Sequence, residues 1–279
     1  MPSAKSVIAR NIWAKSEGKN SLVLKKRGRA LRRAAFCANM YEMHQKIIAD
    51  LNRLADKNKA KILAGFFKTG KGEYGEGDRF IGVNVPNQRK IAKQYCKQIK
   101  YSDLIKLLSS PVHEHRLTGV LILIEKYQKA ESQEKDIVYK LYLDQAKKKK
   151  INNWDLIDLS APKLVGNYLF DKDRQILYNM AKSENVWERR IAILSTFYFI
   201  GQGQFRDTIK ISKILLHDTH DLIHKAVGWM LREAGKRNIS ELVRFLDRYS
   251  DQMPRTMLRY ALEKFDKEDR DKYLFVKFK

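Results

Sequence analysis

Apolar residues recur at every third or fourth position over long stretches of this chain, and that spacing places them along one face of an α-helix. Pro and Gly, which interrupt helices, number only five and fourteen in 279 residues. The alternation of apolar and polar residues that is typical of β-strands does not recur. The pattern therefore predicts an all-α fold. The clearest helical runs are residues 105–108, 120–123, 191–197 and 227–231.

Four segments of the chain resemble one another, because each places a basic residue just ahead of an apolar helical run. Arg116 and Arg190 lie 74 residues apart, which is two periods of about 37, and Arg190 and Lys225 lie 35 apart. A further repeat is then expected near residues 154–158. Periods of this length are typical of HEAT and armadillo helix pairs, so we predict a superhelical solenoid of HEAT-like antiparallel helix pairs. The four segments are residues 113–120, 187–194, 222–229 and 255–262.

The chain is strongly basic, with 56 Lys and Arg residues against 32 Asp and Glu residues and a formal net charge of +24. Because burial and folding are easier near neutrality, this charge indicates a polyanionic partner or an acidic membrane surface. Nine of the net charges lie in residues 1–35, and fifteen lie in the rest of the chain. No run of about 18 apolar residues occurs, so we expect no membrane span.

Residues 1–38 are predicted to be a basic N-terminal extension, and residues 39–279 a single repeat domain. The extension is rich in arginine and poor in acids, which is also the composition of an organelle transit peptide. We favour a solvated arm that contacts DNA or folds onto the domain. Cys37 and Cys96 fit no zinc spacing and no disulfide framework, so a reducing compartment is expected. The default location is the cytoplasm, beside the nucleoid, with organelle targeting left open.

Equivalent positions of successive repeats line one surface of a solenoid, so the basic residues of the repeats are expected to share a concave face. A basic concave face suits the phosphate backbone of a DNA duplex. The alternative is that these cations are solvated, as most surface cations are, but their recurrence at the repeat period favours the interface. The residues expected to contact the DNA backbone are Arg116, Arg189, Lys225 and Arg259, with Arg190 beside them.

Two familiar motifs are absent. Residues 65–72 nearly match a phosphate-binding P-loop, but Gly72 occupies the position that needs Ser or Thr, and no strand precedes it. The pairs His113 with His115 and His217 with His220 are spaced two apart, so on a helix their members point to different sides. We therefore expect no metal and no cofactor.

The segment of residues 152–158 carries the most suggestive chemistry. Asn153 is a plausible N-cap, and Trp154 and Asp158 are four residues apart, so they share one helix face. An aromatic ring and a carboxylate on one face can together hold a cation. Trp187 and Trp229 fall in the next two repeats. The alternative is that these tryptophans are core side chains, but Trp154 and Trp229 lie beside charged residues that suggest exposure to a ligand.

Here the chain resembles the AlkD family of DNA alkylation repair glycosylases. The resemblance extends from about Phe66 to Phe265 and leaves out residues 1–40. Four motifs in the right order are far more specific than any one of them. They are residues 80–86 (Phe-Ile-Gly-Val-Asn-Val-Pro), 154–158 (Trp-Asp-Leu-Ile-Asp), 189–194 (Arg-Arg-Ile-Ala-Ile-Leu) and 225–233 (Lys-Ala-Val-Gly-Trp-Met-Leu-Arg-Glu).

The resemblance implies a superhelix of HEAT-like helix pairs that excises cationic N3- and N7-alkylated purines from double-stranded DNA, without flipping the base into a pocket. It implies that Asp158 is the catalytic carboxylate and that Trp154 and Trp229 are the aromatic pair. Arg190 would be the lesion-side cation that contacts the backbone, and Tyr74 a further aromatic contact, although its loop differs in length from some members of the family. Because no lysine is needed as a nucleophile, a monofunctional hydrolase is expected.

Two other functions are compatible with the sequence. The first is a non-catalytic HEAT-repeat binder of distorted or branched DNA, against which Asp158 and its flanking tryptophans argue. The second is a scaffold for an acidic protein, which would need the charge but not the pairing of Trp154 with Asp158. We expect a monomer, because a solenoid that grips one duplex needs no partner subunit.

Overall fold

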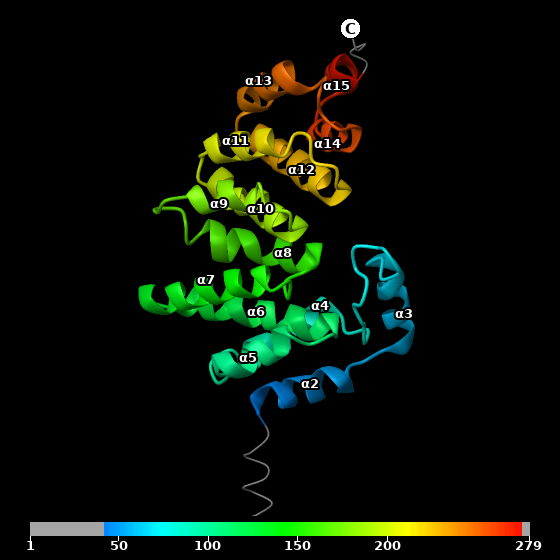
Figure 1. Ribbon diagram of the computed structural model, residues 1–279, viewed down its shortest axis with the longest axis vertical. Helices are drawn as coiled ribbons and strands as arrows, with labels where there is room; N and C mark the ends of the chain where they lie inside the picture. The colour runs from blue at the N-terminus through cyan, green and yellow to red at the C-terminus, as the bar shows by residue number, and fades with distance from the viewer. Residues whose placement is uncertain (1–41, 275–279) are drawn as a thin grey trace, which may run out of the picture. The chain divides into compact units, whose positions relative to one another are not determined.

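The computed structural model describes residues 42–274, and all structural statements concern those residues. They form α-helices and one π-helix, with no β-strand and a single isolated parallel bridge between Arg79 and Val112, so the all-α prediction is confirmed (Figure 1). The helices are α2 (Met43–Arg53), α3 (Lys57–Phe66), α4 (Val85–Tyr95), α5 (Tyr101–Leu108), α6 (His113–Lys129), α7 (Ser132–Lys147), α8 (Trp154–Ala161), the π-helix η1 (Pro162–Gly166), α9 (Gln175–Met180), α10 (Val186–Gly201), α11 (Arg206–Ile214), α12 (Asp221–Arg237), α13 (Ile239–Tyr249), α14 (Arg255–Ala261) and α15 (Lys267–Leu274).

The chain divides into two units, residues 1–46 and 47–279. Only residues 42–46 of the first unit are described, and they include the start of α2. The predicted basic extension over residues 1–38 lies outside the described residues. All helices from α3 onward belong to the second unit, which contains the whole site described below. No described helix has the length and apolar character needed to cross a membrane.

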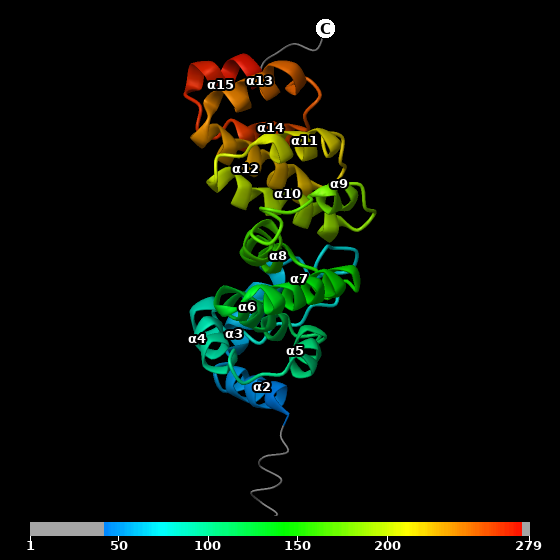
Figure 2. The same ribbon diagram turned by 90° about the vertical axis from the view of Figure 1, so that its left-hand side faces the viewer.

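From α4 to α14, the helices alternate between two rows (Figures 1 and 2). The even-numbered helices from α4 to α14 each pack against the next even-numbered helix. Odd-numbered helices pack against this row: α5 and α7 against α6, α9 against α10, and α13 against α12. In Figure 1, α9, α11 and α13 lie to the left of α10, α12 and α14. This arrangement confirms the prediction of HEAT-like helix pairs.

Three even-numbered helices, α6, α10 and α12, begin with the same hydrogen-bonded motif. In each, a side-chain oxygen accepts from the backbone N–H two residues later, at 2.8–3.1 Å. The backbone carbonyl of the same residue accepts from the side chain six residues later. The accepting residues are Ser110, Ser183 and Asp218, and the side chains six residues later are Arg116, Arg189 and His224.

This motif corrects the repeat register inferred from the sequence. It places Arg116 in the position of Arg189 and His224, whereas the sequence alignment matched Arg116 with Arg190. Arg190 is therefore equivalent to Lys225, as the alignment had it, but not to Arg116. Because successive residues of an α-helix are about 100° apart around its axis, a slip of one residue turns a side chain to a different face.

Helix α8 is short because Pro162 follows its last residue. Proline has no N–H to donate to the carbonyl four residues earlier, which here belongs to Asp158. The chain continues as the π-helix η1, in which Asn167 donates to the Pro162 carbonyl at 3.0 Å. At the end of η1, a Cβ atom on Gly166 would lie 2.3 Å from the Ser195 carbonyl oxygen. Glycine therefore lets η1 pack closely on α10, which fixes α8 relative to α10.

Candidate active site

A pocket of about 460 Å³ gathers most of the residues that the sequence singled out. The even-numbered helices α8, α10, α12 and α14 form much of it, and the end of α3 with the following loop completes it. Six predicted site residues line it: Tyr74, Trp154, Asp158, Arg190, Lys225 and Trp229. Four further residues that the sequence did not single out also line it: Phe66, Lys68, Leu222 and Tyr260.

The start of α8 directs two of these side chains toward the pocket. Asn153 is fully buried at the N-cap of α8, and its side-chain oxygen accepts from the backbone N–H of Trp154, the first residue of the helix, at 2.8 Å. Trp154 and Asp158 then follow one helical turn apart and share one face, as predicted from their spacing. The cap, the pocket-facing ring and the carboxylate thus all belong to one short helix.

Asp158 forms a bidentate ion pair with Arg190. The Nε and Nη2 atoms of Arg190 donate to the two carboxylate oxygens at 2.9 and 2.8 Å. The remaining Nη1 atom donates to the backbone carbonyl of Leu222, at the start of α12. The side chain of Arg190 is 5% exposed and that of Asp158 is 17% exposed. Arg190 therefore positions the carboxylate, and it does not stand free in the pocket as a backbone-binding cation would.

Burial raises the pKa of Asp158 above its ordinary value, although the Arg190 guanidinium acts in the opposite direction. The negative charge of Asp155 raises it further. A carboxylate with a raised pKa is a better proton acceptor than an exposed one. Asp158 is thus held in a fixed orientation and is suited to accept a proton or to stabilise a nearby cation.

Contacts with neighbouring side chains hold the two indole rings of the pocket. Trp154 stacks on Phe67 with a centroid distance of 5.2 Å and an interplanar angle of 16°, and the ring of Phe66 meets it edge-on at 5.9 Å. Trp229 is anchored by a hydrogen bond from its Nε1 to Glu233 at 3.1 Å. These contacts fix the two indoles while leaving both in the pocket lining.

Trp187 is a core side chain, which was the alternative interpretation considered for the tryptophans. It is buried, with 6% of its surface exposed, and does not line the pocket. The ring of Tyr74 meets it edge-on at a centroid distance of 6.4 Å. Trp187 therefore supports Tyr74, which does line the pocket.

A buried charge cluster holds the start of α8 in place. His113, at the start of α6, contacts Asp78 through Nδ1 at 3.1 Å and Asp155 through Nε2 at 2.8 Å. Asn153 also donates to Asp78, at 3.2 Å. The cluster thus joins the loop before α4, the start of α6 and the start of α8.

The charges in this cluster stabilise one another. Burial alone would lower the pKa of His113, but Asp155 and Asp78 raise it to about 9. Burial alone would also raise the pKa of Asp78, yet its bonds with His113 and Arg116 hold it below the ordinary value. The raised pKa favours the imidazolium form of His113, and both of its ring nitrogens already contact carboxylates.

Two predicted backbone contacts do not face the pocket. Arg116 is buried, and its guanidinium donates to Asp78 at 2.6 Å and to the Ser110 carbonyl at 3.0 Å. Arg189 donates to Asp218 at 2.6 Å and to the Ser183 carbonyl at 2.9 Å. Both arginines join the beginning of a helix to neighbouring segments, so neither is free to bind a phosphate.

The other two predicted backbone contacts lie at the pocket or next to it. The side chain of Lys225 is 41% exposed and pairs with Asp221, one turn earlier, at 2.7 Å. Arg259 is exposed and lines a neighbouring depression of about 530 Å³, which Lys225 and Tyr260 also border. These two cations are placed where a charged ligand of the pocket could extend.

The chain was compared with known proteins. It matches the family described as DNA alkylation repair enzyme over residues 47–265. No match was found among curated proteins. Among solved structures it is similar to a "Predicted DNA alkylation repair enzyme from Enterococcus faecalis", with 16% sequence identity and a TM-score of 0.61. That likeness covers 76% of this chain and 97% of the other and shows a shared fold. Because the family match spans more than half of its length, the chain belongs to the DNA alkylation repair enzyme family.

Proposed function

We propose that this protein is a monofunctional DNA glycosylase that hydrolyses the N-glycosidic bond of cationic N3- and N7-alkylated purines in duplex DNA. One observation carries the proposal: the carboxylate of Asp158 lines a pocket together with the indole rings of Trp154 and Trp229. An anion and two aromatic faces form a site for a positively charged nucleotide. Family membership supports DNA as the substrate.

The charge of the lesion explains why so few groups are needed. A cationic purine is a good leaving group, because the electron pair of the broken bond neutralises it without a general acid. Positive charge develops on the sugar as the bond breaks, and the carboxylate of Asp158 would stabilise that charge. A water molecule then adds to the sugar carbon and gives its proton to Asp158. The raised pKa of Asp158 favours this last transfer.

The remaining residues of the site would bind and select the nucleotide. Each indole would favour a cationic base over a neutral one by about 0.5–2 kcal/mol. Lys225 and Arg259, at the pocket and beside it, would contact the phosphate backbone. We propose that the base remains in the duplex, which a fluorescent base analogue placed beside the lesion can test, since unstacking would raise its emission.

Base release from methylated duplex DNA tests the proposal. Asp158→Asn keeps an oxygen for Arg190 but removes the charge, so release should fall by about a hundredfold or more while duplex affinity changes little. Asp144→Asn, at an exposed carboxylate outside the pocket, is the matched control and should retain release. Thermal unfolding of each variant verifies the fold.

Release that persists in Asp158→Asn would remove the catalytic role of this residue. Duplex binding with no release from the unaltered chain would instead favour a non-catalytic binder of distorted or branched DNA. The two results are distinguishable because the first concerns the variant and the second the unaltered chain.

A further inference from the structure

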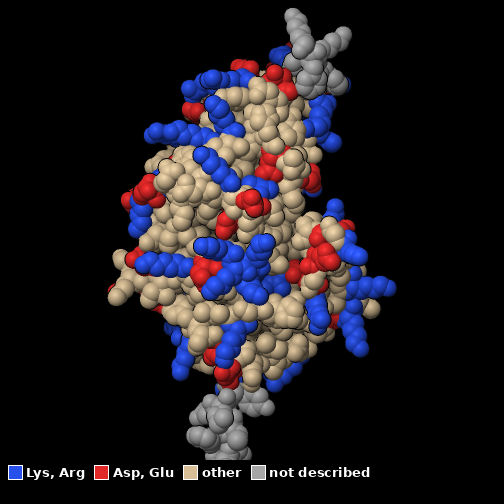
Figure 3. Space-filling model, in the orientation of Figure 1, with Lys and Arg blue, Asp and Glu red and all other residues tan. Residues whose placement is uncertain are grey.

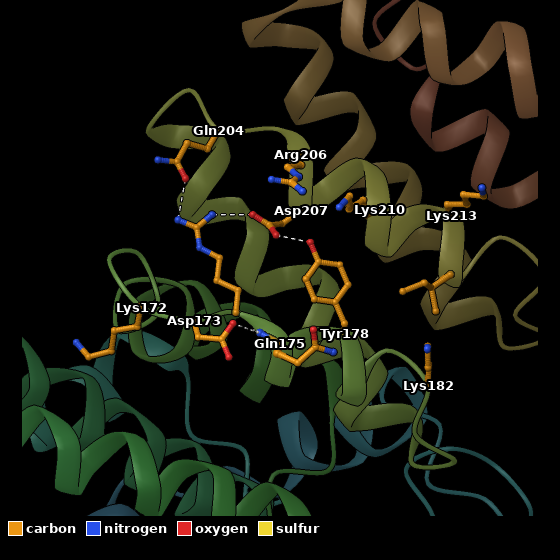
Figure 4. A pocket seen from close by; sticks show the side chains of 12 residues that line it. Lys172, Asp173, Gln175, Tyr178, Lys182, Gln204, Arg206, Asp207, Lys210 and Lys213 are labelled. Carbon is orange, nitrogen blue, oxygen red and sulfur yellow. Dashed lines mark hydrogen bonds and ion pairs between the residues drawn. The ribbon is translucent and has the colours of Figure 1, made fainter.

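A second and larger cleft lies among the odd-numbered helices, outside the site described above. It has a volume of about 1000 Å³ and is bordered by α9, α11 and the segments that precede them (Figure 4). None of its residues lines the aromatic pocket. The residues that line it are Lys172, Asp173, Arg174, Gln175, Tyr178, Lys182, Gln204, Arg206, Asp207, Lys210, Lys213 and Ile214.

Hydrogen bonds between side chains of the protein fix the base of this cleft. Asp207 accepts from Arg174 at 2.6 Å and from the hydroxyl of Tyr178 at 2.5 Å. Arg174 also donates to Gln204 at 2.7 Å, and its guanidinium lies 3.8 Å from the ring centroid of Phe199. Arg174 and Asp207 neutralise each other, so they shape the cleft and add no net charge to it.

The remaining charges of the cleft are almost all positive. Arg206, Lys210 and Lys213 are exposed, and no ion pair links them to any acid of the described residues. Lys172 and Lys182 are also exposed, and the other carboxylate of the lining belongs to Asp173. The cleft therefore presents five exposed cations against one acid. Figure 3 shows, on one face of the molecule, that Lys and Arg side chains cover more surface than Asp and Glu side chains.

The spacing of the cations indicates an extended ligand. Arg206, Lys210 and Lys213 follow one another by four and three residues, so they form a stripe along one face of α11, over about 10 Å. Lys172 precedes α9 and Lys182 follows it, so cations stand near both ends of that helix as well. A row of cations over this length suits successive charges of a polymer better than a single phosphate group.

The chemistry of the lining favours a nucleic acid backbone over an acidic peptide. Protein interfaces depend on buried apolar or aromatic anchors. Among the residues that line the cleft, Ile214 is the only exposed large apolar side chain. Single strands bind by stacking bases on exposed aromatic rings. The one ring here, that of Tyr178, is partly buried, and its hydroxyl is bound to Asp207. Contacts to phosphates alone are typical of duplex binding without sequence preference.

We propose that the cleft between α9 and α11 binds the phosphate backbone of a second segment of duplex DNA. The aromatic pocket is formed by α8, α10, α12 and α14 with the end of α3 and the loop after it, whereas this cleft is bordered by α9 and α11, so the two would hold different segments. The proposal goes beyond glycosylase activity and does not depend on it.

A bridging experiment with the full chain tests this proposal. Short undamaged duplexes labelled with a donor or an acceptor fluorophore should show energy transfer when the protein binds one of each. A triple variant, Arg206→Gln with Lys210→Gln and Lys213→Gln, should lose most of this transfer. Its binding should also depend less on salt, with a slope of log K against log[salt] that is smaller by up to about three.

A control variant removes the same charge elsewhere. Lys97→Gln with Lys140→Gln and Lys147→Gln alters three exposed lysines that line neither the cleft nor the aromatic pocket, and it should retain bridging. Equal loss in the two variants would overturn the proposal, because it would show a general charge effect. Bridging that persists in the cleft variant would also overturn it. The proposal would likewise be overturned if the cleft bound polyglutamate, an acidic peptide, and did not bind duplex DNA.

The outcome can be separated from the proposed function. Asp158→Asn should still bridge duplexes, and the cleft variant should still release base from a short methylated duplex. Loss of bridging in the cleft variant would support the second site even if the protein released no base.

Discussion

Two Asp–Arg pairs in this protein lie in different surroundings, one joined by a single hydrogen bond and the other bidentate. The carboxylate of Asp78 binds Arg116 at 2.6 Å, and His113 and Asn153 also contact it, so its side chain is only 4% exposed. The carboxylate of Asp158 is held by one side chain, that of Arg190, and borders a pocket. The ion pair itself does not make a carboxylate available for chemistry. Free volume beside it and the number of its partners decide that.

The largest effect that we expect from the difference between the two pairs is on the stability of the fold. Asp78→Ala leaves the buried charge of Arg116 without its ion-pair partner and leaves His113 with Asp155 alone, so we expect a loss of about 3–5 kcal/mol in the free energy of unfolding. Urea unfolding measures this loss. Asp144→Ala removes an exposed, solvent-screened pair with Lys148, one helical turn later, and should leave the free energy of unfolding almost unchanged. A similar cost for the two variants would mean that the buried cluster does not hold the fold together.

The pH dependence of stability sharpens the same contrast. The pKa of His113 is raised from 6.5 in the unfolded chain to about 9 in the folded protein. Its contribution is therefore fully present below pH 6.5 and is lost as the pH rises through about 9. The free energy of unfolding should fall over this range by up to about 3 kcal/mol. His113→Gln should be less stable at pH 6 and should lack this decline; an equal decline in the variant would assign it to other groups.

The smallest expected effect concerns the orientation of Asp158. Arg190→Lys keeps a positive charge but cannot form the bidentate pair, so base release should fall by about tenfold. Because a lysine would neutralise the carboxylate less closely, the pKa of Asp158 should rise. The acid limb of the pH–rate profile should then move to higher pH. An unchanged profile would indicate that Arg190 serves only the packing of α8 on α10.

The sequence predicted the repeat fold from local spacing, and it predicted part of the pocket from spacing and another part, Tyr74 included, from the family resemblance. Trp154 and Asp158 share a helix face by their spacing alone, and the match of Arg190 with Lys225 spans one repeat. The match of Arg116 with Arg190 was wrong because Arg189 and Arg190 are adjacent cations. Spacing over two periods cannot tell which of them faces the pocket, whereas the hydrogen bonds at the helix starts can.

Other parts of the site could not be predicted because they depend on contacts between distant segments. Phe66 and Lys68 line the pocket only because the end of α3 meets α8 in the folded chain. Similarly, His113 and Asp155 are separated by 42 residues, and nothing in either local pattern indicates their contact.

The hydrogen-bonded motif at the starts of α6, α10 and α12 has a consequence for the order of folding. Each copy closes over six residues, so each repeat can form its own helix start as soon as that stretch of chain is present. The pocket has no such independence, because the bond between Asp78 and Asn153 joins residues 75 positions apart. During synthesis, the scaffold can therefore assemble repeat by repeat, while the binding site must wait until its most distant parts have emerged.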